Sequence, residues 1–154
     1  MNKLEEEVKE FLRSLEREEG HSFEILPKHK LEGASGQRRE VDFVIKNFNE
    51  IKYLVECKDV SSPNFQTFHT QMCRAYTELC DLLLKSNDDF SHPAVRGIVV
   101  VRDISYIFEK NSWSDEFDKW RNLFSPINTK FFNLDMFKDE GLGIRDLIRD
   151  EEDG

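Results

Sequence analysis

The stretch that decides the fold is residues 36–45, GQRREVDFVI, together with residues 53–58, YLVECK. Residues 40–46 alternate apolar and polar side chains and include β-branched ones, which predicts a strand, and residues 51–58 predict a second. Residues 47–50 predict a turn, so the two strands form a hairpin. Because side chains alternate along a strand, Glu56 and Lys58 point to one face and Cys57 to the other.

The register of this hairpin follows from its pattern. A loop of residues 48–50 would pair residue 47 with residue 51, and Asp42 with Glu56, with their Cβ atoms ~5 Å apart. One face is then entirely apolar, with Val41, Phe43, Ile45, Tyr53, Val55 and Cys57. The other carries Val44 and Leu54, then Asp42, Glu56 and Lys58. A slip by one residue would put charges into the apolar face, which is costly.

Two carboxylates this close repel unless a cation neutralises them. Their oxygens suit Mg²⁺ or Mn²⁺. Lys58 can stabilise the remaining charge and a nearby hydroxide or phosphate. Phosphodiester hydrolysis needs a metal that lowers the pKa of water and a cation beside the phosphorus. The alternative is that Asp42, Glu56 and Lys58 form an exposed cross-strand salt-bridge cluster, which is common on sheet faces.

The rest of the chain predicts an α/β fold, a mixed β-sheet flanked by helices. Its 154 residues make one domain, residues 1–149, followed by an acidic tail at residues 150–154. We expect a helix at 3–19 stopped by Gly20, extended pieces at 23–26 and 28–31 broken by Pro27, and a flexible loop at 33–36. Further on we expect a helix at 64–85 capped by Ser62, a buried parallel strand at 97–101, a helix at 114–123 capped by Ser114, a strand at 130–137 and a helix at 142–149.

The charge of the chain bears on its partners. The net charge is −9, from 22 basic and 31 acidic residues, whereas a general nucleic-acid binder is usually basic. A metal-dependent phosphodiesterase with a small footprint is compatible with this charge. A local basic strip, Lys28, Lys30, Arg38 and Arg39 against the single acid Glu32, is where phosphate contacts are expected. A solvated loop explains each of these residues equally well.

Other features bear on the cellular location of the protein and on the roles of single residues. No apolar run approaches the ~20 residues of a membrane helix, and the charged N-terminus is unlike a signal peptide. Three cysteines without paired spacing argue against disulfides and zinc, so we expect a cytoplasmic protein without membrane contacts. Trp113, Phe117 and Trp120 have helical spacing, which favours a core role over base stacking. We expect Cys57 to be a small core residue.

The hairpin resembles the PD-(D/E)XK nuclease superfamily, and within it the Mrr-like restriction endonucleases and archaeal Holliday-junction resolvases. The matching features are a loop with Gly36, Asp42 in an apolar strand, and Glu56-Cys57-Lys58 at the end of the next strand. Leu4-Glu5 resembles the Glu-bearing start of the family's first helix, with Glu6 as the second choice. Val41 stands where the motif's name has Pro. The resemblance spans residues 3–101 and implies a restriction-endonuclease-like αβββαβ core.

The resemblance also implies roles. Asp42 and Glu56 would ligate Mg²⁺ or Mn²⁺ with the carbonyl of Cys57, and Lys58 would orient or deprotonate the attacking water. Glu5 would bond to the metal's water shell or bind a second ion. Phosphate contacts are expected from Arg38, Arg39, Ser62 and the free N–H groups of the helix after Ser62. Some family members use a Gln-x-x-x-Tyr on that helix; Gln71 and Tyr76 are spaced one residue longer.

Two classes of function remain open. One is a DNA endonuclease of the restriction, defence or repair kind, which the intact set of Glu5, Asp42, Glu56 and Lys58 favours; many relatives act as homodimers because two strands must be cut. The other is a catalytically silent nuclease-fold domain that binds a protein partner, which the charge of −9 favours. A subunit of a defence or mobile-element complex, whose partner supplies DNA specificity, would reconcile the two observations.

Overall fold

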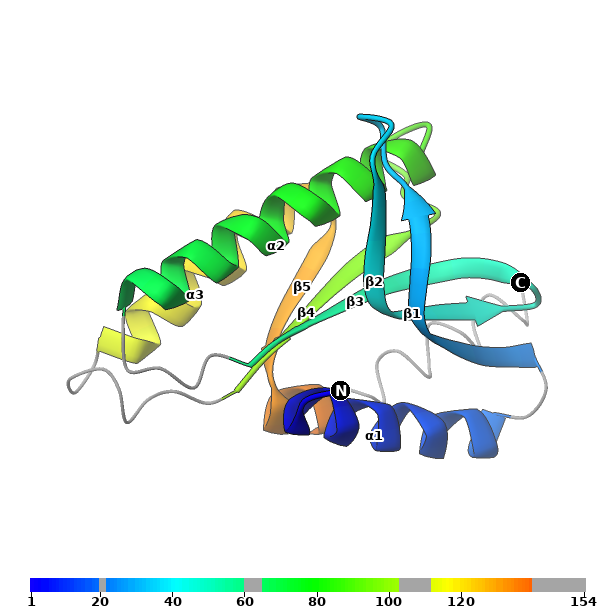
Figure 1. Ribbon diagram of the computed structural model, residues 1–154, viewed down its shortest axis with the longest axis horizontal. Coiled ribbons are helices and arrows are strands. Elements are labelled where there is room, and N and C mark those ends of the chain that lie inside the picture. Colours follow the sequence, from blue (N-terminus) through cyan, green and yellow to red (C-terminus); the bar gives the residue numbers. More distant parts are fainter. Residues whose placement is uncertain (20–21, 60–64, 103–111, 140–154) are drawn as a thin grey trace.

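The computed structural model describes residues 1–19, 22–59, 65–102 and 112–139. The predicted stop at Gly20, the cap at Ser62, the helix at 142–149 and the acidic tail lie outside these residues. The elements run α1 (Lys3–Glu19), β1 (Phe23–Glu32), β2 (Arg38–Asn47), β3 (Glu50–Lys58), α2 (Phe65–Ser86), β4 (Arg96–Val101), α3 (Ser112–Phe124), the short 3₁₀ helix η2 (Ser125–Ile127) and β5 (Thr129–Asn133). This order confirms the predicted αβββαβ core (Figure 1).

One mixed sheet organises the molecule. Its five strands lie in the order β1-β2-β3-β4-β5. The pairs β1–β2 and β2–β3 are antiparallel, whereas β4 runs parallel to both β3 and β5. The residues from Gly97 to Val101 are all buried. The apolar run therefore forms a central parallel strand, as predicted.

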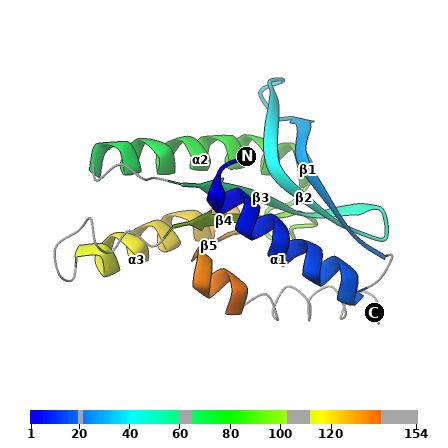
Figure 2. The ribbon, with the colours of Figure 1, turned by 60° about the horizontal axis from the view of Figure 1, so that its bottom comes forward.

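Helices cover both faces of the sheet. Figures 1 and 2 show α1 on one face, with the helical segment 134–139 beside it, and α2 and α3 on the other. The α1-side core contains Leu4, Val8, Leu12, Leu15, Phe43, Ile45, Val55 and Ile98, among others. The α2-side core contains Phe68, Met72, Ala75, Leu79, Val44, Leu54, Val99 and Trp120, among others. Phe117 also belongs to the α2-side core, so the predicted core role of Phe117 and Trp120 is confirmed.

The hairpin of β2 and β3 has the predicted register in its middle. Phe43 lies opposite Val55, Val44 opposite Leu54, and Ile45 opposite Tyr53. The predicted pairing of residue 47 with residue 51 is wrong, because Asn47 lies opposite Glu50. The turn has only two residues, Phe48 and Asn49, with φ of 52° and 65°, as in a type I′ hairpin. A register shift between Ile45 and Lys46 absorbs the difference.

The outer hairpin, β1 and β2, differs from expectation in two ways. Pro27 does not divide the segment, because β1 is continuous and lies at the sheet edge, where a missing N–H is tolerated. Val41 was expected on the face of Phe43 but belongs to the α2-side core. Opposite Asp42, Lys28 has a φ of 51°, and Figure 1 shows the hairpin bending toward the C-terminal end of α2. This bend turns Val41 toward α2.

The loop at 33–36 is docked rather than free. The N–H of Ala34 donates to the carbonyl of Asp81 at 3.0 Å, and the N–H of Ser35 donates to Oδ1 of Asp81 at 2.7 Å. Gly33 is buried against Asp81, and Gly36 takes a φ of 88°. The predicted flexible loop is therefore a turn attached to α2.

Two predictions near the C-terminus need correction. The strand expected at 130–137 ends at Asn133, and residues 134–139 are helical. The Asn133 side chain accepts the N–H of Met136 at 2.8 Å, which caps this helix and ends the strand. Helix α3 begins at Ser112, so the predicted cap Ser114 lies within its first turn. Across the described residues we find no helix with the length and apolar content that crossing a bilayer requires.

Candidate active site

Asp42 and Glu56 meet where β2 and β3 leave the regular ladder. The N–H of Asp42 donates to Oε1 of Glu56 at 3.3 Å, and the N–H of Cys57 donates to Oδ2 of Asp42 at 2.8 Å. Each carboxylate therefore has one oxygen held by the backbone of the other strand. The two predicted acidic residues are brought together.

Lys58 supplies a positive charge beside Glu56. Its Nζ lies 3.7 Å from Oε2 of Glu56, and both side chains are largely buried. Burial raises the pKa of Glu56 to about 8, with a further contribution from the negative charge of Asp42, while Lys58 opposes the shift. The alternative of an exposed salt-bridge cluster does not fit, because Glu56 is only 4% exposed.

Glu5 of α1 joins the site through a lysine. Lys28 of β1 places its Nζ 2.8 Å from Oε2 of Glu5 and 3.2 Å from Oδ1 of Asp42. Asn2 orients Glu5 from the other side, because its Oδ1 accepts the N–H of Glu5 at 2.8 Å and its Nδ2 donates to Oε1 at 3.2 Å. Glu6, the second choice, is exposed. The structure thus brings Glu5 to Asp42.

Sequence analysis missed this role of Lys28 and placed the residue in a basic strip. Burial alone would lower the pKa of the Lys28 ammonium, but hydrogen bonds to Glu5 and Asp42 outweigh it and hold the pKa above its usual value. The signal available in the sequence was a lysine directly after Pro27. Only the pairing of β1 with β2 shows that this lysine faces Asp42.

The donor set fits a hard divalent cation. Oδ1 of Asp42 lies beside the ammonium of Lys28, and Oε2 of Glu56 lies beside that of Lys58, so both oxygens already have a cation as neighbour. Carboxylate oxygens are the ligands that Mg²⁺ and Mn²⁺ prefer. Cys57 is buried in the α1-side core, as expected, and burial raises the pKa of its thiol, which leaves its carbonyl as the available ligand. Within the described ranges, no three or more His, Cys, Asp or Glu residues are grouped as a metal site.

The predicted phosphate-binding residues have different surroundings. Nε of Arg39 donates to Oδ2 of Asp81 at 2.8 Å, so this arginine is engaged by α2, whereas Arg38 is exposed. Gln71 is half-buried on α2, and among the described residues it has no hydrogen bond to Asp42, Glu56 or Lys58. Ser62 lies outside the described residues.

A second ion pair next to the site was also missed. Arg102, directly after β4, donates from Nε to Oδ1 of Asp59 at 2.6 Å and from Nη2 to Oδ2 at 2.8 Å. The hydrogen bond from Arg102 lowers the pKa of Asp59. Because Asp59 follows Lys58 in the chain, this bidentate pair fixes the end of β3 beside the end of β4.

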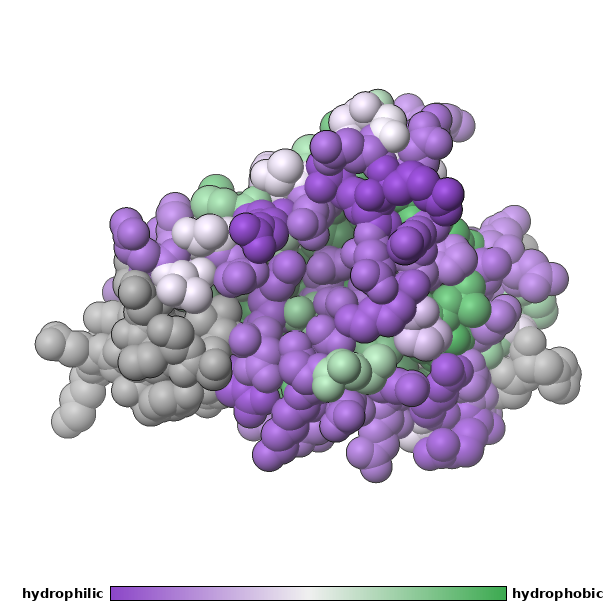
Figure 3. All heavy atoms as spheres, in the orientation of Figure 1, coloured by the Kyte–Doolittle hydropathy of each residue, from purple (hydrophilic) through white to green (hydrophobic). Residues whose placement is uncertain are grey.

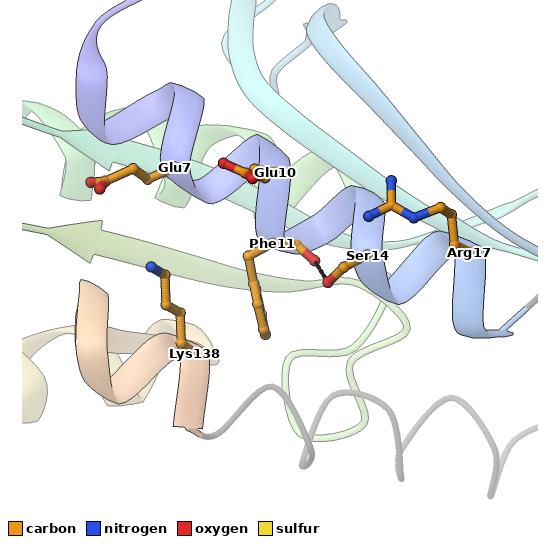
Figure 4. Close-up of a pocket in the computed structure, with 6 residues that line it drawn as sticks. All are labelled: Glu7, Glu10, Phe11, Ser14, Arg17 and Lys138. Carbon is orange, nitrogen blue, oxygen red and sulfur yellow. Dashed lines mark hydrogen bonds between the residues drawn. The ribbon is translucent and has the colours of Figure 1, made fainter.

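The surface around these elements is predominantly hydrophilic on the face drawn in Figure 3. A pocket of about 390 Å³ lies between α1 and the segment 134–139 (Figure 4) and is lined by Glu7, Glu10, Phe11, Ser14, Arg17 and Lys138. None of the residues that line it belongs to the candidate site. The polar cluster of Glu5, Lys28, Asp42, Glu56 and Lys58 is therefore distinct from this pocket.

Comparison with known proteins shows neither a family nor an activity for this chain. No family model matches this chain, and no curated protein matches it. A similar solved structure is that of AF1548, a protein of unknown function, with 14% sequence identity and a TM-score of 0.47. The match covers 84% of this chain and 58% of that one, so this chain spans less than two thirds of that protein.

Proposed function

We propose that this protein is a metal-dependent nuclease that hydrolyses DNA phosphodiester bonds, of the restriction, defence or repair type. The observation that carries the proposal is the reciprocal bonding of Asp42 and Glu56 across two strands, with buried Glu56 beside Lys58. Burying carboxylates and a lysine together costs desolvation free energy, and apolar residues would often stabilise the fold at least as well. Such a cluster therefore favours a functional role over a purely structural one. Ionisable groups with shifted pKa values concentrate at functional sites.

Each side chain has a definable task in this proposal. Asp42, Glu56 and the carbonyl of Cys57 would hold Mg²⁺ or Mn²⁺, which when bound lowers the pKa of water and polarises a phosphate. Lys58, adjacent to Glu56, would hold the attacking water or a phosphate oxygen. Arg38 is exposed and available for the DNA backbone.

The test is cleavage of DNA by the full chain with Mg²⁺ or Mn²⁺. We expect cleavage by wild type and a loss of about 100-fold or more in Asp42→Ala and Lys58→Ala, the order found when one electrostatic catalytic group is removed. Asp88→Ala removes an exposed carboxylate, and Lys46→Ala a lysine elsewhere on β2; both should cleave normally. Cleavage retained by Asp42→Ala and Lys58→Ala would place the active site elsewhere.

The substrate form tests the proposed homodimer. A supercoiled plasmid cut in one strand accumulates as a nicked circle, whereas coordinated cutting of both strands yields linear DNA directly. We expect the linear product from a homodimer. Accumulation of the nicked circle would instead indicate a chain that acts alone.

A second candidate is a silent nuclease-fold domain that binds a protein partner. It is favoured by Lys28, whose ammonium already pairs with both Glu5 and Asp42, and by the net charge of −9. It predicts neither cleavage nor Mn²⁺ binding. A subunit that takes its DNA specificity from a partner differs again, because it binds Mn²⁺ through Asp42 and cleaves only when that partner is added.

A further inference from the structure

Lys28 reaches the candidate site from the edge of the sheet. Its ammonium lies between Oε2 of Glu5, at 2.8 Å, and Oδ1 of Asp42, at 3.2 Å. Lys28 belongs to β1, Glu5 to α1 and Asp42 to β2, so one positive charge connects three elements. A cation held between two carboxylate oxygens is the arrangement that a bridging metal ion would otherwise provide.

Within β1, Lys28 is the residue with a positive φ. Lys28 has a φ of 51°, a left-handed conformation that residues other than glycine rarely adopt. The strand pairing is unaltered on either side, with Pro27 opposite Phe43 and His29 opposite Val41. The distortion is therefore confined to the position that faces Asp42, where it accompanies the contact of the ammonium with the site.

The charges of the site favour one divalent ion over two. With Glu56 ionised, as a metal ligand must be, Glu5, Asp42 and Glu56 carry three formal negative charges. Lys28 and Lys58 carry two positive ones, which leaves one negative charge. One divalent ion would change this to a single positive charge, which a hydroxide or a phosphate oxygen balances. Two ions with both lysines in place would leave three positive charges around three carboxylates whose side chains are at most 15% exposed, and like charges this close repel.

We propose that Lys28 is a positioning residue that takes the place of a second metal ion. Its ammonium holds Glu5 and Asp42, so the site accepts a single divalent ion, at Asp42 and Glu56. Glu5 then serves as the partner of Lys28 and does not ligate a metal. This inference rests on the proposed nuclease function, because only a metal-dependent site has a number of ions to fix.

The experiment counts the Mn²⁺ ions bound per full chain by isothermal titration without DNA, with circular dichroism to verify folding. Wild type should bind one ion. Lys28→Met and Lys28→Gln should each bind two, because Oε2 of Glu5 and Oδ1 of Asp42 lose their cation. Lys28→Arg keeps the charge and should bind one. Lys30→Met removes the charge of an exposed lysine on the same strand and should also bind one.

The second ion should depend on Glu5. Adding Glu5→Gln to Lys28→Met should therefore return the count to one. Two ions bound by wild type, or a single ion bound by both Lys28→Met and Lys28→Gln at any affinity, would overturn the role of Lys28. If no folded variant binds Mn²⁺, wild type included, the proposed nuclease function itself fails, so the two failures are distinguishable.

Discussion

The backbone N–H of Asp42 donates to Oε1 of Glu56 at 3.3 Å, which ties the two acidic residues of the site together across β2 and β3. The reciprocal bond, from the N–H of Cys57 to Oδ2 of Asp42, is 2.8 Å. The backbone thus holds one oxygen of each carboxylate. Their charges, in contrast, depend on what surrounds Glu56, because it is almost completely buried.

The raised pKa of Glu56 predicts a pH-dependent stability. Burial and the charge of Asp42 raise the pKa from 4.5 to about 8. Glu56 therefore contributes most below pH 4.5, where it is protonated in both states. That contribution falls as the pH rises toward 8 and is gone above it. We expect the stability of Glu56→Gln relative to wild type to rise by up to about 5 kcal/mol from pH 4 to pH 9, at about 1.4 kcal/mol per pKa unit.

The measurement is urea unfolding of both proteins across this range, with EDTA to remove metal ions. Glu50→Gln changes a carboxylate on the same strand whose side chain is 75% exposed, and its difference from wild type should stay nearly constant with pH. A constant difference for Glu56→Gln as well would show that Glu56 titrates as an ordinary carboxyl group.

The Asp81 carboxylate attaches the outer hairpin of β1 and β2 to α2. It accepts hydrogen bonds from the N–H and Oγ of Ser35 and from Nε of Arg39. The hydrogen bond from the Arg39 guanidinium lowers the pKa of Asp81. This attachment is therefore present at neutral pH and weakens as the pH falls below 3.8. We expect Asp81→Ala to lower the melting temperature and to speed hydrogen exchange at Ala34 and Ser35.

A matched control is Asp89→Ala. Asp89 accepts hydrogen bonds from Ser91 and His92 close to it in sequence, and does not join two elements. Exchange at Ala34 and Ser35 should be unchanged in this variant. Equal exchange rates in Asp81→Ala and wild type would mean that the Asp81 carboxylate is not needed to attach this turn to α2.

The hairpin register could be predicted because one face is apolar and a slip would bury charges. That argument fixed Phe43 opposite Val55, and it brought Asp42 to Glu56, which a hydrogen bond joins just beyond the paired residues. It did not fix the length of the turn, because Phe48 is an unfavourable residue for the left-handed conformation that a two-residue turn requires. Local preference thus failed where the tertiary structure imposes the backbone.

Lys28 and the segment after β5 were not predictable for different reasons. Lys28 meets Glu5 only through the pairing of β1 with β2, and Pro27 suggested that β1 was interrupted. After Asn133, the apolar residues Leu134, Met136 and Phe137 fit a strand as well as a helix. The hydrogen bond from the N–H of Met136 to Asn133 decides for the helix, and it depends on where the strand ends.

Removal of the Asn87 side chain should strongly lower the stability of the fold. This side chain is buried, accepts the N–H groups of Ala94 and Val95, and donates to the carbonyls of Leu83 and Val95. Asn87→Ala would remove the partner of the Ala94 and Val95 N–H groups and of the Val95 carbonyl, whereas the Leu83 carbonyl keeps the N–H of residue 87. Each unsatisfied buried group costs about 1–3 kcal/mol. We expect a loss of about 3 kcal/mol in the free energy of unfolding, measured in urea. Asn122→Ala, at an exposed position on α3, should cost much less.

The close approach of β4 and β5 leaves no room for a side chain at Gly97. A Cβ at this position would lie 2.4 Å from Oγ1 and 3.2 Å from Cβ of Thr129, its partner on β5. Thr129 cannot easily move, because it is stiff at χ1 and its Oγ1 donates to the carbonyl of Ile127 at 3.1 Å. Gly97→Ala should therefore lower the free energy of unfolding by about 2 kcal/mol through overpacking.

A thermodynamic cycle with Thr129→Ala tests this contact. Because Thr129→Ala removes the closest atom, the double variant should lose less free energy of unfolding than the sum of the two single losses. Additive losses would show that the strands move apart to accept the methyl group.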